Sequence, residues 1–202
     1  MAFSPSNYLK NYFKKKKPFT IATDILFIVF IILLIIPGTR KEVSSWLVRL
    51  TALPPSELSA ESQFKISKEA RNWQLYDMEG NVVTLDEMLD KPVFLNFWAT
   101  WCPPCIGELP GIKDLYNTYK DKVRFVLVTN EQPGQVSKFA AEHDYRKLPF
   151  YIGRGTPSDF YSESIPTTFV IDKDGTVVIS KKGAARWNSG RVEKLLDELL
   201  QK

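Results

Sequence analysis

The sequence predicts an α/β domain with a mixed central sheet, preceded by one amino-terminal transmembrane helix. Three observations lead to this prediction: a long apolar run near the amino terminus, strand patterns that alternate with helical patterns, and two hairpin signals that require antiparallel strand pairs. The chain has 202 residues, of which 44% are apolar, so it can form one ordinary domain with a buried core and an appendage.

Residues 19–36 read FTIATDILFIVFIILLII and predict the membrane anchor. A helix of this length spans roughly 27 Å, close to the hydrocarbon thickness of a bilayer. The five lysines before the run predict that residues 1–18 are a cytoplasmic basic tail and that the chain after the run lies outside the cytoplasm. A cleavable signal peptide is the alternative, but the run is long for one and no clear cleavage site follows it.

Residues 37–62 are predicted to form a juxtamembrane segment and a linker. Four apolar residues at helical spacing predict a short amphipathic helix, either on the membrane surface or in a dimer contact. These residues are Val43, Trp46, Leu47 and Leu50. The stretch LPPSELSAES, residues 53–62, is predicted to hold the following domain away from the bilayer.

The positive charge of the chain is confined to its amino-terminal part. Residues 1–59 carry a net charge of +5, whereas residues 60–202 carry a net charge of −1. A domain that binds nucleic acid needs a basic face, so no nucleic-acid partner is predicted for this one.

Strand and helix patterns alternate within the predicted domain, residues 63–202. The predicted strands are residues 72–76, 81–84, 93–98, 123–129, 167–171 and 176–180. One predicted helix begins at Pro103, and two others cover residues 135–143 and 192–200. Glu79-Gly80 and Asp174-Gly175 predict hairpin turns, and the first of these hairpins is an amino-terminal extension of the domain. The order of elements therefore predicts a mixed sheet flanked by helices.

The only two cysteines of the chain, Cys102 and Cys105, follow a predicted buried strand in the stretch WCPPC. Structural zinc needs four ligands, which two thiols and one histidine cannot supply in a monomer, so no metal or other cofactor is predicted. A purely structural disulfide is not favoured, because closing so short a loop contributes only about 2 kcal/mol.

A redox-active pair is the favoured interpretation of these cysteines. Cys102 is predicted at the amino end of a helix, where free N–H groups and the helix dipole favour the thiolate, and Cys105 follows one turn later. Pro103 and Pro104 suit the first helical positions, and we expect them to tune the redox potential by removing N–H donors.

Two stretches of the sequence resemble the TlpA/ResA-like branch of the thioredoxin superfamily. They are FLNFWATWCPPC (94–105) and IPTTFVIDKDG (165–175), supported by Pro110 and by the order of elements from Asn72 to about Leu200. The resemblance implies a thioredoxin-like fold and a membrane-anchored thiol–disulfide oxidoreductase of the bacterial inner membrane, with its domain outside the cytoplasm. It further implies that Pro166 is a cis proline facing the active-site disulfide and that Ile165 presents its backbone to an extended substrate.

The resemblance also implies partners for the protein. Its substrates would be protein disulfides, with apocytochrome c as the best-known client of this branch, and an integral membrane thiol transporter would resupply electrons. The residues expected to contact the substrate are Trp101, Pro103, Pro104, Ile165 and Pro166.

One departure from cytoplasmic-type thioredoxins directs attention to Glu108. Those proteins have a buried aspartate six residues before the first cysteine, where this chain has Asn96, which cannot take a proton. Glu108 lies three residues after Cys105, on the same helical face, and a glutamate there also resembles the TlpA/ResA branch. We expect Glu108 to be partly desolvated, to have a raised pKa and to relay the proton of Cys105; a solvated helix carboxylate is the alternative.

A reductase of protein disulfides is the favoured function, with Cys102 attacking the substrate and Cys105 resolving the mixed disulfide. An oxidase or isomerase would use the same residues, because the direction depends on the potentials of the partners. Two further classes stay open: a thiol peroxidase, which needs a lone peroxidatic cysteine, and a non-catalytic binding module. Insulin reduction and hydrogen-peroxide turnover distinguish these classes.

Overall fold

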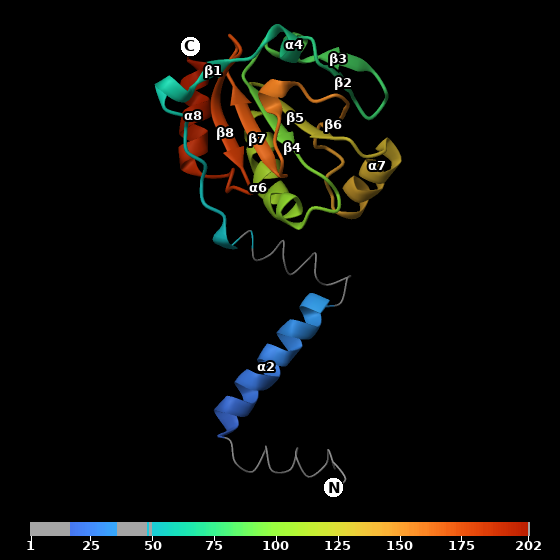
Figure 1. Ribbon diagram of the computed structural model, residues 1–202, viewed down its shortest axis with the longest axis vertical. Helices are drawn as coiled ribbons and strands as arrows, with labels where there is room; N and C mark the ends of the chain where they lie inside the picture. Colours follow the sequence, from blue (N-terminus) through green and yellow to red (C-terminus); the bar gives the residue numbers. More distant parts are fainter. Residues whose placement is uncertain (1–16, 36–47, 49, 202) are drawn as a thin grey trace. The chain divides into compact units, whose positions relative to one another are not determined.

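The computed structural model describes residues 17–35, 48 and 50–201, which belong to two separate units (Figure 1). The first unit contains helix α2 (Pro18–Ile35), which nearly coincides with the predicted anchor. Its apolar side chains are exposed from Ile25 to Ile32. No helix in the part of the chain that the structure describes is both long and apolar enough to cross a membrane. Residues 1–16 of the predicted basic tail and most of the predicted amphipathic helix lie outside the described residues.

The second unit is built on a mixed sheet, as predicted, and its described residues contribute eight strands in the order β1-β8-β7-β4-β5-β6-β2-β3. Neighbours β4, β5 and β6 are parallel, whereas β7 runs antiparallel to both β4 and β8. The strands are β1 (Phe64–Lys65), β2 (Gln74–Tyr76), β3 (Val82–Thr84), β4 (Val93–Phe97), β5 (Arg124–Thr129), β6 (Phe150–Gly153), β7 (Thr167–Ile171) and β8 (Thr176–Lys182).

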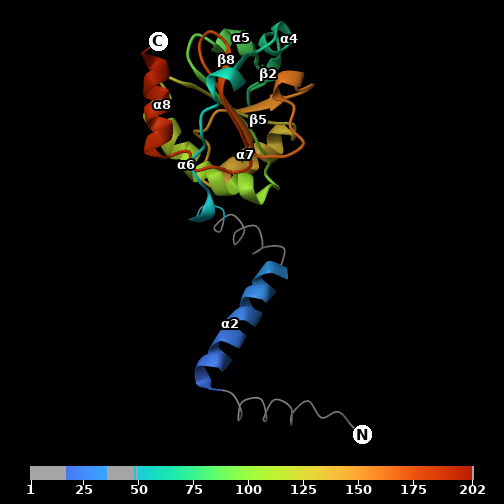
Figure 2. The same ribbon diagram turned by 60° about the vertical axis from the view of Figure 1, so that its left-hand side comes forward.

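Helices cover both faces of this sheet (Figures 1 and 2). They are α4 (Lys68–Arg71), α5 (Leu85–Met88), α6 (Pro103–Tyr119), α7 (Pro133–Glu142) and α8 (Gly190–Leu200), with the short 3₁₀ helices η1 (Ala60–Ser62) and η2 (Ser158–Phe160). Local sequence sets where they begin. At α5, for example, Thr84 and Glu87 form a reciprocal capping box, which satisfies two backbone N–H groups that a helix start leaves free.

The central strand β4 shows how the sequence divides the core into two layers. Successive side chains of a strand point to opposite faces, so Phe94 and Asn96 face one side and Leu95 the other. Phe94 packs in the cluster that contains the buried faces of α6, α7 and α8. Leu95 packs in the second cluster, with residues of α4, α5 and η2. Asn96 is therefore directed at α6, the helix that follows the cysteine segment.

The predicted linker of residues 53–62 packs against the domain. The backbone N–H of Leu58 donates to the carbonyl of Val178 in β8 at 2.9 Å, and the N–H of Arg186 donates to the carbonyl of Leu53 at 3.1 Å. Pro55 is buried. Together with β1, this extended segment covers the edge of β8, whose backbone groups would otherwise be unpaired.

The structure contains two strands that the sequence did not predict, β1 and β6. Strand β1 has only two residues, and β6 has four, directly after Pro149. Runs this short carry too little periodicity to be distinguished from loops, and their pairing partners are distant in the sequence. In this fold β6 extends the parallel part of the sheet and links it to the amino-terminal hairpin.

Gly153 at the end of β6 offers a test of the packing in the second layer. A Cβ at this position would lie 2.6 Å from Val128 Cγ1 and 2.7 Å from Trp73 Cζ2, and the indole N–H of Trp73 is held by the carbonyl of Arg154 at 2.8 Å. We expect Gly153→Ala to lower the free energy of unfolding by about 1–3 kcal/mol, because the ring cannot move freely.

Urea unfolding of the two proteins measures this effect. Gly134→Ala in α7 is the matched control, because its added Cβ would meet nothing within 4 Å. The control is expected to unfold at the wild-type urea concentration or slightly above it. Equal midpoints for Gly153→Ala and the wild type would contradict the close packing.

Candidate active site

The two cysteines lie at the amino end of α6 and are joined by a disulfide. The Sγ atoms are 2.10 Å apart and the Cα atoms 5.3 Å apart. Cys102 is the residue that caps α6, and Pro103 and Pro104 occupy its first two positions, as predicted. Because prolines have no N–H, the first helical N–H is that of Cys105, and it donates to Cys102 Sγ at 3.3 Å. This donor and the helix dipole both favour negative charge on Cys102 Sγ once the disulfide opens.

The loop before β7 brings a backbone carbonyl to the disulfide. The peptide bond between Ile165 and Pro166 is cis, as the resemblance implied. The carbonyl oxygen of Ile165 lies 3.8 Å from Cys102 Sγ. In the closed disulfide Cys102 Sγ has no proton, so it donates no hydrogen bond to this carbonyl. A Cys102 thiol could donate one to the same oxygen. Pro166 is buried, and its carbonyl accepts a hydrogen bond from the N–H of Gly183 at 2.8 Å.

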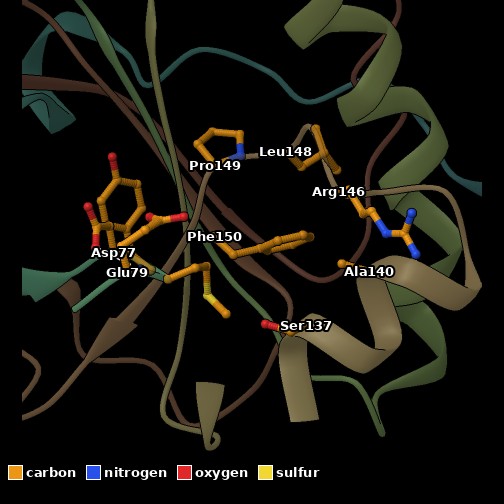
Figure 3. A pocket seen from close by; sticks show the side chains of 10 residues that line it. Asp77, Glu79, Ser137, Ala140, Arg146, Leu148, Pro149 and Phe150 are labelled. Atoms are coloured by element: carbon orange, nitrogen blue, oxygen red, sulfur yellow. Dashed lines mark hydrogen bonds between the residues drawn. The ribbon is translucent and has the colours of Figure 1, made fainter. Parts of the chain in front are cut away.

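A hollow of about 540 Å³ is lined, among others, by Trp101, which precedes Cys102, and by Ile165, whose carbonyl lies near Cys102 Sγ. Trp101 is 58% exposed and Tyr161, on the same hollow, is 69% exposed. Figure 3 shows a different hollow, of about 490 Å³, to which Asp77 and Arg146 contribute. Its lining includes none of the predicted site residues, so the surface beside Cys102 is the one relevant to disulfide chemistry.

Glu131 holds the loop that leads into the cysteine segment. Its carboxylate accepts from the backbone N–H of Thr100 and from the Thr100 hydroxyl, both at 2.7 Å. The side chain of Gln135 also donates to Glu131, at 2.7 Å. This arrangement fixes the backbone two residues before Cys102. No local pattern in the sequence indicates this contact, because Glu131 follows a different strand, β5.

Glu108 is buried on α6, one turn after Cys105, and is only 4% exposed. Its Oε1 accepts from Asn96 Nδ2 at 2.8 Å, and its Oε2 accepts from the Ala185 N–H and from Trp187 Nε1, each at 3.0 Å.

Burial raises the pKa of Glu108 from its ordinary value of 4.5 to about 7, although these three hydrogen bonds and the charge of Lys181 act in the opposite direction. The carboxyl of Glu108 is therefore desolvated, and the alternative of a solvated helix carboxylate is wrong.

The sequence does not reveal the groups that surround this carboxyl. From the sequence, Asn96 stands out only as a residue that cannot take a proton, and Trp187 belongs to no recognisable motif. Trp187 lies 79 residues from Glu108, is fully buried and packs edge-on against Phe94 with ring centroids 4.8 Å apart. The position of a glutamate near a cysteine motif indicates only weakly that its side chain is buried. Hydrogen-bond partners this distant in the sequence cannot be recognised from any local pattern.

Comparisons with known proteins agree with this geometry. The model of the AhpC/TSA family matches residues 66–180. The thiol-disulfide oxidoreductase ResA of Bacillus cereus (strain ATCC 10987 / NRS 248) is 37% identical over 148 residues, which are 71% of this chain and 82% of the relative. The thioredoxin-like protein YneN of Bacillus subtilis (strain 168) is 34% identical over 115 residues, 54% of this chain and 67% of the relative.

A solved structure from Chlorobium tepidum, described as the thiol:disulfide interchange protein DsbE, is also similar. It superposes with a TM-score of 0.58 at 27% identity and covers 68% of this chain and 98% of its own. The fold, the closed cysteine pair and these relatives lead to one conclusion. The chain belongs to the AhpC/TSA family and is a thioredoxin-like thiol–disulfide oxidoreductase of the ResA type, with the Cys102–Cys105 pair as its redox centre.

Proposed function

We propose that the protein is a reductase of protein disulfides that works outside the cytoplasm, held at the bacterial inner membrane by residues 19–36. The observation that supports this most is the environment of the cysteine pair. Cys102 Sγ has a helix N–H and the Ile165 carbonyl beside it, and a buried carboxyl follows Cys105 by one turn.

Cys102 is the nucleophile in the proposed reaction. In the reduced protein its thiolate attacks one sulfur of the client disulfide, a Cys102–client bond forms, and the client sulfur–sulfur bond breaks. The displaced client sulfur leaves as a thiolate and takes a proton from solvent. The Cys105 N–H stabilises the attacking thiolate, and the Ile165 carbonyl and Pro166 align the client backbone, with Trp101, Pro103 and Pro104 forming the surrounding contact surface.

Cys105 resolves the mixed disulfide and Glu108 accepts its proton. The Cys105 thiol gives its proton to the Glu108 carboxylate and its sulfur attacks Cys102 Sγ, which restores the disulfide and releases the second client sulfur as a thiolate. Two electrons have then passed from the protein to the client. A carboxyl with a pKa of about 7 is suited to this step, because it exchanges protons near neutral pH.

The membrane attachment is proposed from the sequence. Residues 25–36 are an unbroken apolar run and the five lysines before residue 19 favour a cytoplasmic amino terminus, so a single pass would place the domain outside. Electrons would then come from a membrane thiol transporter, and apocytochrome c is the proposed client. Protease added to intact spheroplasts should digest the domain while leaving the anchor in the membrane fraction; a protected domain would contradict this orientation.

Reduction of insulin disulfides by the full-length chain in detergent tests the proposed activity. With dithiothreitol as the electron source, the wild type is expected to accelerate insulin precipitation and Cys102→Ser to give the uncatalysed rate. A wild type no faster than Cys102→Ser would support a non-catalytic binding module. Consumption of hydrogen peroxide by the wild type, without insulin reduction, would support a thiol peroxidase.

A further inference from the structure

We propose that Asn96 is a positioning residue whose side-chain amide turns over when Glu108 takes up a proton, so that one residue serves both forms of the carboxyl. This inference rests on the proposed role of Glu108 as the proton acceptor of Cys105. It follows from the contacts of three buried side chains, Asn96, Glu108 and Thr168.

The contacts of Glu108 suit only its ionised form. The three groups that bond its oxygens are N–H groups of Asn96, Ala185 and Trp187, and each of them donates. A protonated carboxyl must itself donate one hydrogen bond, and none of these three N–H groups can accept it. Glu108 is nearly inaccessible, so solvent is a poor source of that acceptor. The proton therefore needs an acceptor within the protein.

Asn96 carries that acceptor. Its Nδ2 donates to Glu108 Oε1 and to Thr168 Oγ1, each at 2.8 Å, while its Oδ1 is buried and has no hydrogen-bond partner among the described residues. A half-turn of the amide brings Oδ1 to the position of Nδ2, where it accepts from protonated Glu108. Thr168 fits both orientations, because a hydroxyl can accept from an amide N–H or donate to an amide oxygen.

Charged groups from other elements act on the same carboxyl. Lys181 of β8 favours the ionised form of Glu108, and the helix that carries Glu108 also carries the cysteine pair, which does not titrate while the disulfide is closed. In the disulfide form, therefore, a change at Asn96 near neutral pH reports on Glu108 and not on the sulfurs. This property allows the inference to be tested without a catalytic assay.

Nuclear magnetic resonance of the oxidised full-length chain in detergent, with ¹⁵N-labelled asparagine, is the test. The side-chain amide signals of Asn96 are expected to shift with a midpoint near the pKa of Glu108, about 7. Nuclear Overhauser effects from these amide protons to Thr168 should be strong above the midpoint and lost below it. In Glu108→Gln neither change should occur.

Two variants separate a positioning role from a merely structural one. Asn96→Leu removes both the donor to the carboxylate and the acceptor for the protonated carboxyl, so each form of Glu108 loses a hydrogen bond and the midpoint of its carboxyl ¹³C signal should rise by well under about one pH unit. Thr168→Val keeps the bond between Asn96 and Glu108 and should leave that midpoint within a few tenths of a pH unit. A midpoint that rises by about one pH unit or more in Asn96→Leu would show that Asn96 only donates to the carboxylate, and would overturn the proposal.

Other outcomes also decide the question. If Glu108 titrates but the Asn96 amide keeps its contacts with Thr168 at every pH, the amide does not turn and the proposal is wrong. If Glu108 does not titrate between pH 5 and 9, the proposal fails together with the proposed proton relay. Insulin reduction by the same preparation shows separately whether the redox function stands.

Discussion

Replacing Cys105 with serine is expected to leave the protein covalently attached to its client through Cys102. Cys102 would still attack a client disulfide, because the helix N–H that stabilises its thiolate belongs to the backbone of residue 105 and remains in the variant. No second sulfur would be present to resolve the mixed disulfide, since the chain has only these two cysteines. Turnover should stop after one event.

Expression of Cys105→Ser in the native cell, followed by non-reducing electrophoresis and mass spectrometry, measures this effect. Bands of higher mass that collapse with dithiothreitol should appear, and the attached peptides identify the client. Cys102→Ser is the matched control, because Cys105 is fully buried and should capture little. Adducts that form equally on both variants would contradict the assignment of Cys102 as the nucleophile.

The second large effect is a pH dependence of stability that comes from Glu108. Its pKa is about 7 in the folded protein and near the ordinary 4.5 in the unfolded chain. Between these values the unfolded chain loses the proton and the folded protein keeps it, so folding becomes less favourable as pH rises. The free energy of unfolding should fall by about 3 kcal/mol from below pH 4.5 to above pH 7 through this group alone.

Urea unfolding of the oxidised wild type and of Glu108→Gln at several pH values isolates this contribution. The variant lacks the titrating group. The difference in free energy of unfolding, wild type minus variant, should therefore fall between about pH 4.5 and pH 7 and level off above pH 7. Glu163→Gln, at an exposed glutamate, is the control and should follow the wild-type curve. A constant difference between wild type and Glu108→Gln would show that the buried carboxyl is not protonated in the folded state.

The parts of the fold that could be predicted are those with strong local patterns. The apolar strand β4, the Asp174-Gly175 hairpin between β7 and β8, and the helix after Pro103 all carry their own periodicity or turn chemistry. Strands β1 and β6 do not, because two to four residues gain their structure from partners elsewhere in the sheet. The docking of residues 53–62 on β8 is similarly a tertiary property, since an exposed Pro-rich segment and a docked one have the same composition.

The residues of the candidate site likewise fall into those that a local sequence pattern identifies and those that only the folded structure reveals. Cys102, Cys105 and Glu108 could be identified because they follow one another at intervals of three residues along the chain. The groups that determine how Glu108 behaves, Asn96 and Trp187, come from β4 and from the segment before α8. Only the folded arrangement brings their N–H groups to the same carboxyl. The direction of the shift in the pKa of Glu108 could therefore be expected from the sequence, whereas the groups that surround its carboxyl could not.

The claim on which this account most depends is that the Cys102–Cys105 disulfide opens and closes reversibly. Equilibration of the full-length chain with glutathione or dithiothreitol buffers, followed by thiol alkylation and mass measurement, gives its reduction potential. A two-electron transition at a potential on the order of −250 mV or lower is expected for a reductant of protein disulfides. A potential near −120 mV would contradict the direction of the reaction, and a bridge that stays closed in excess dithiothreitol would contradict the account itself.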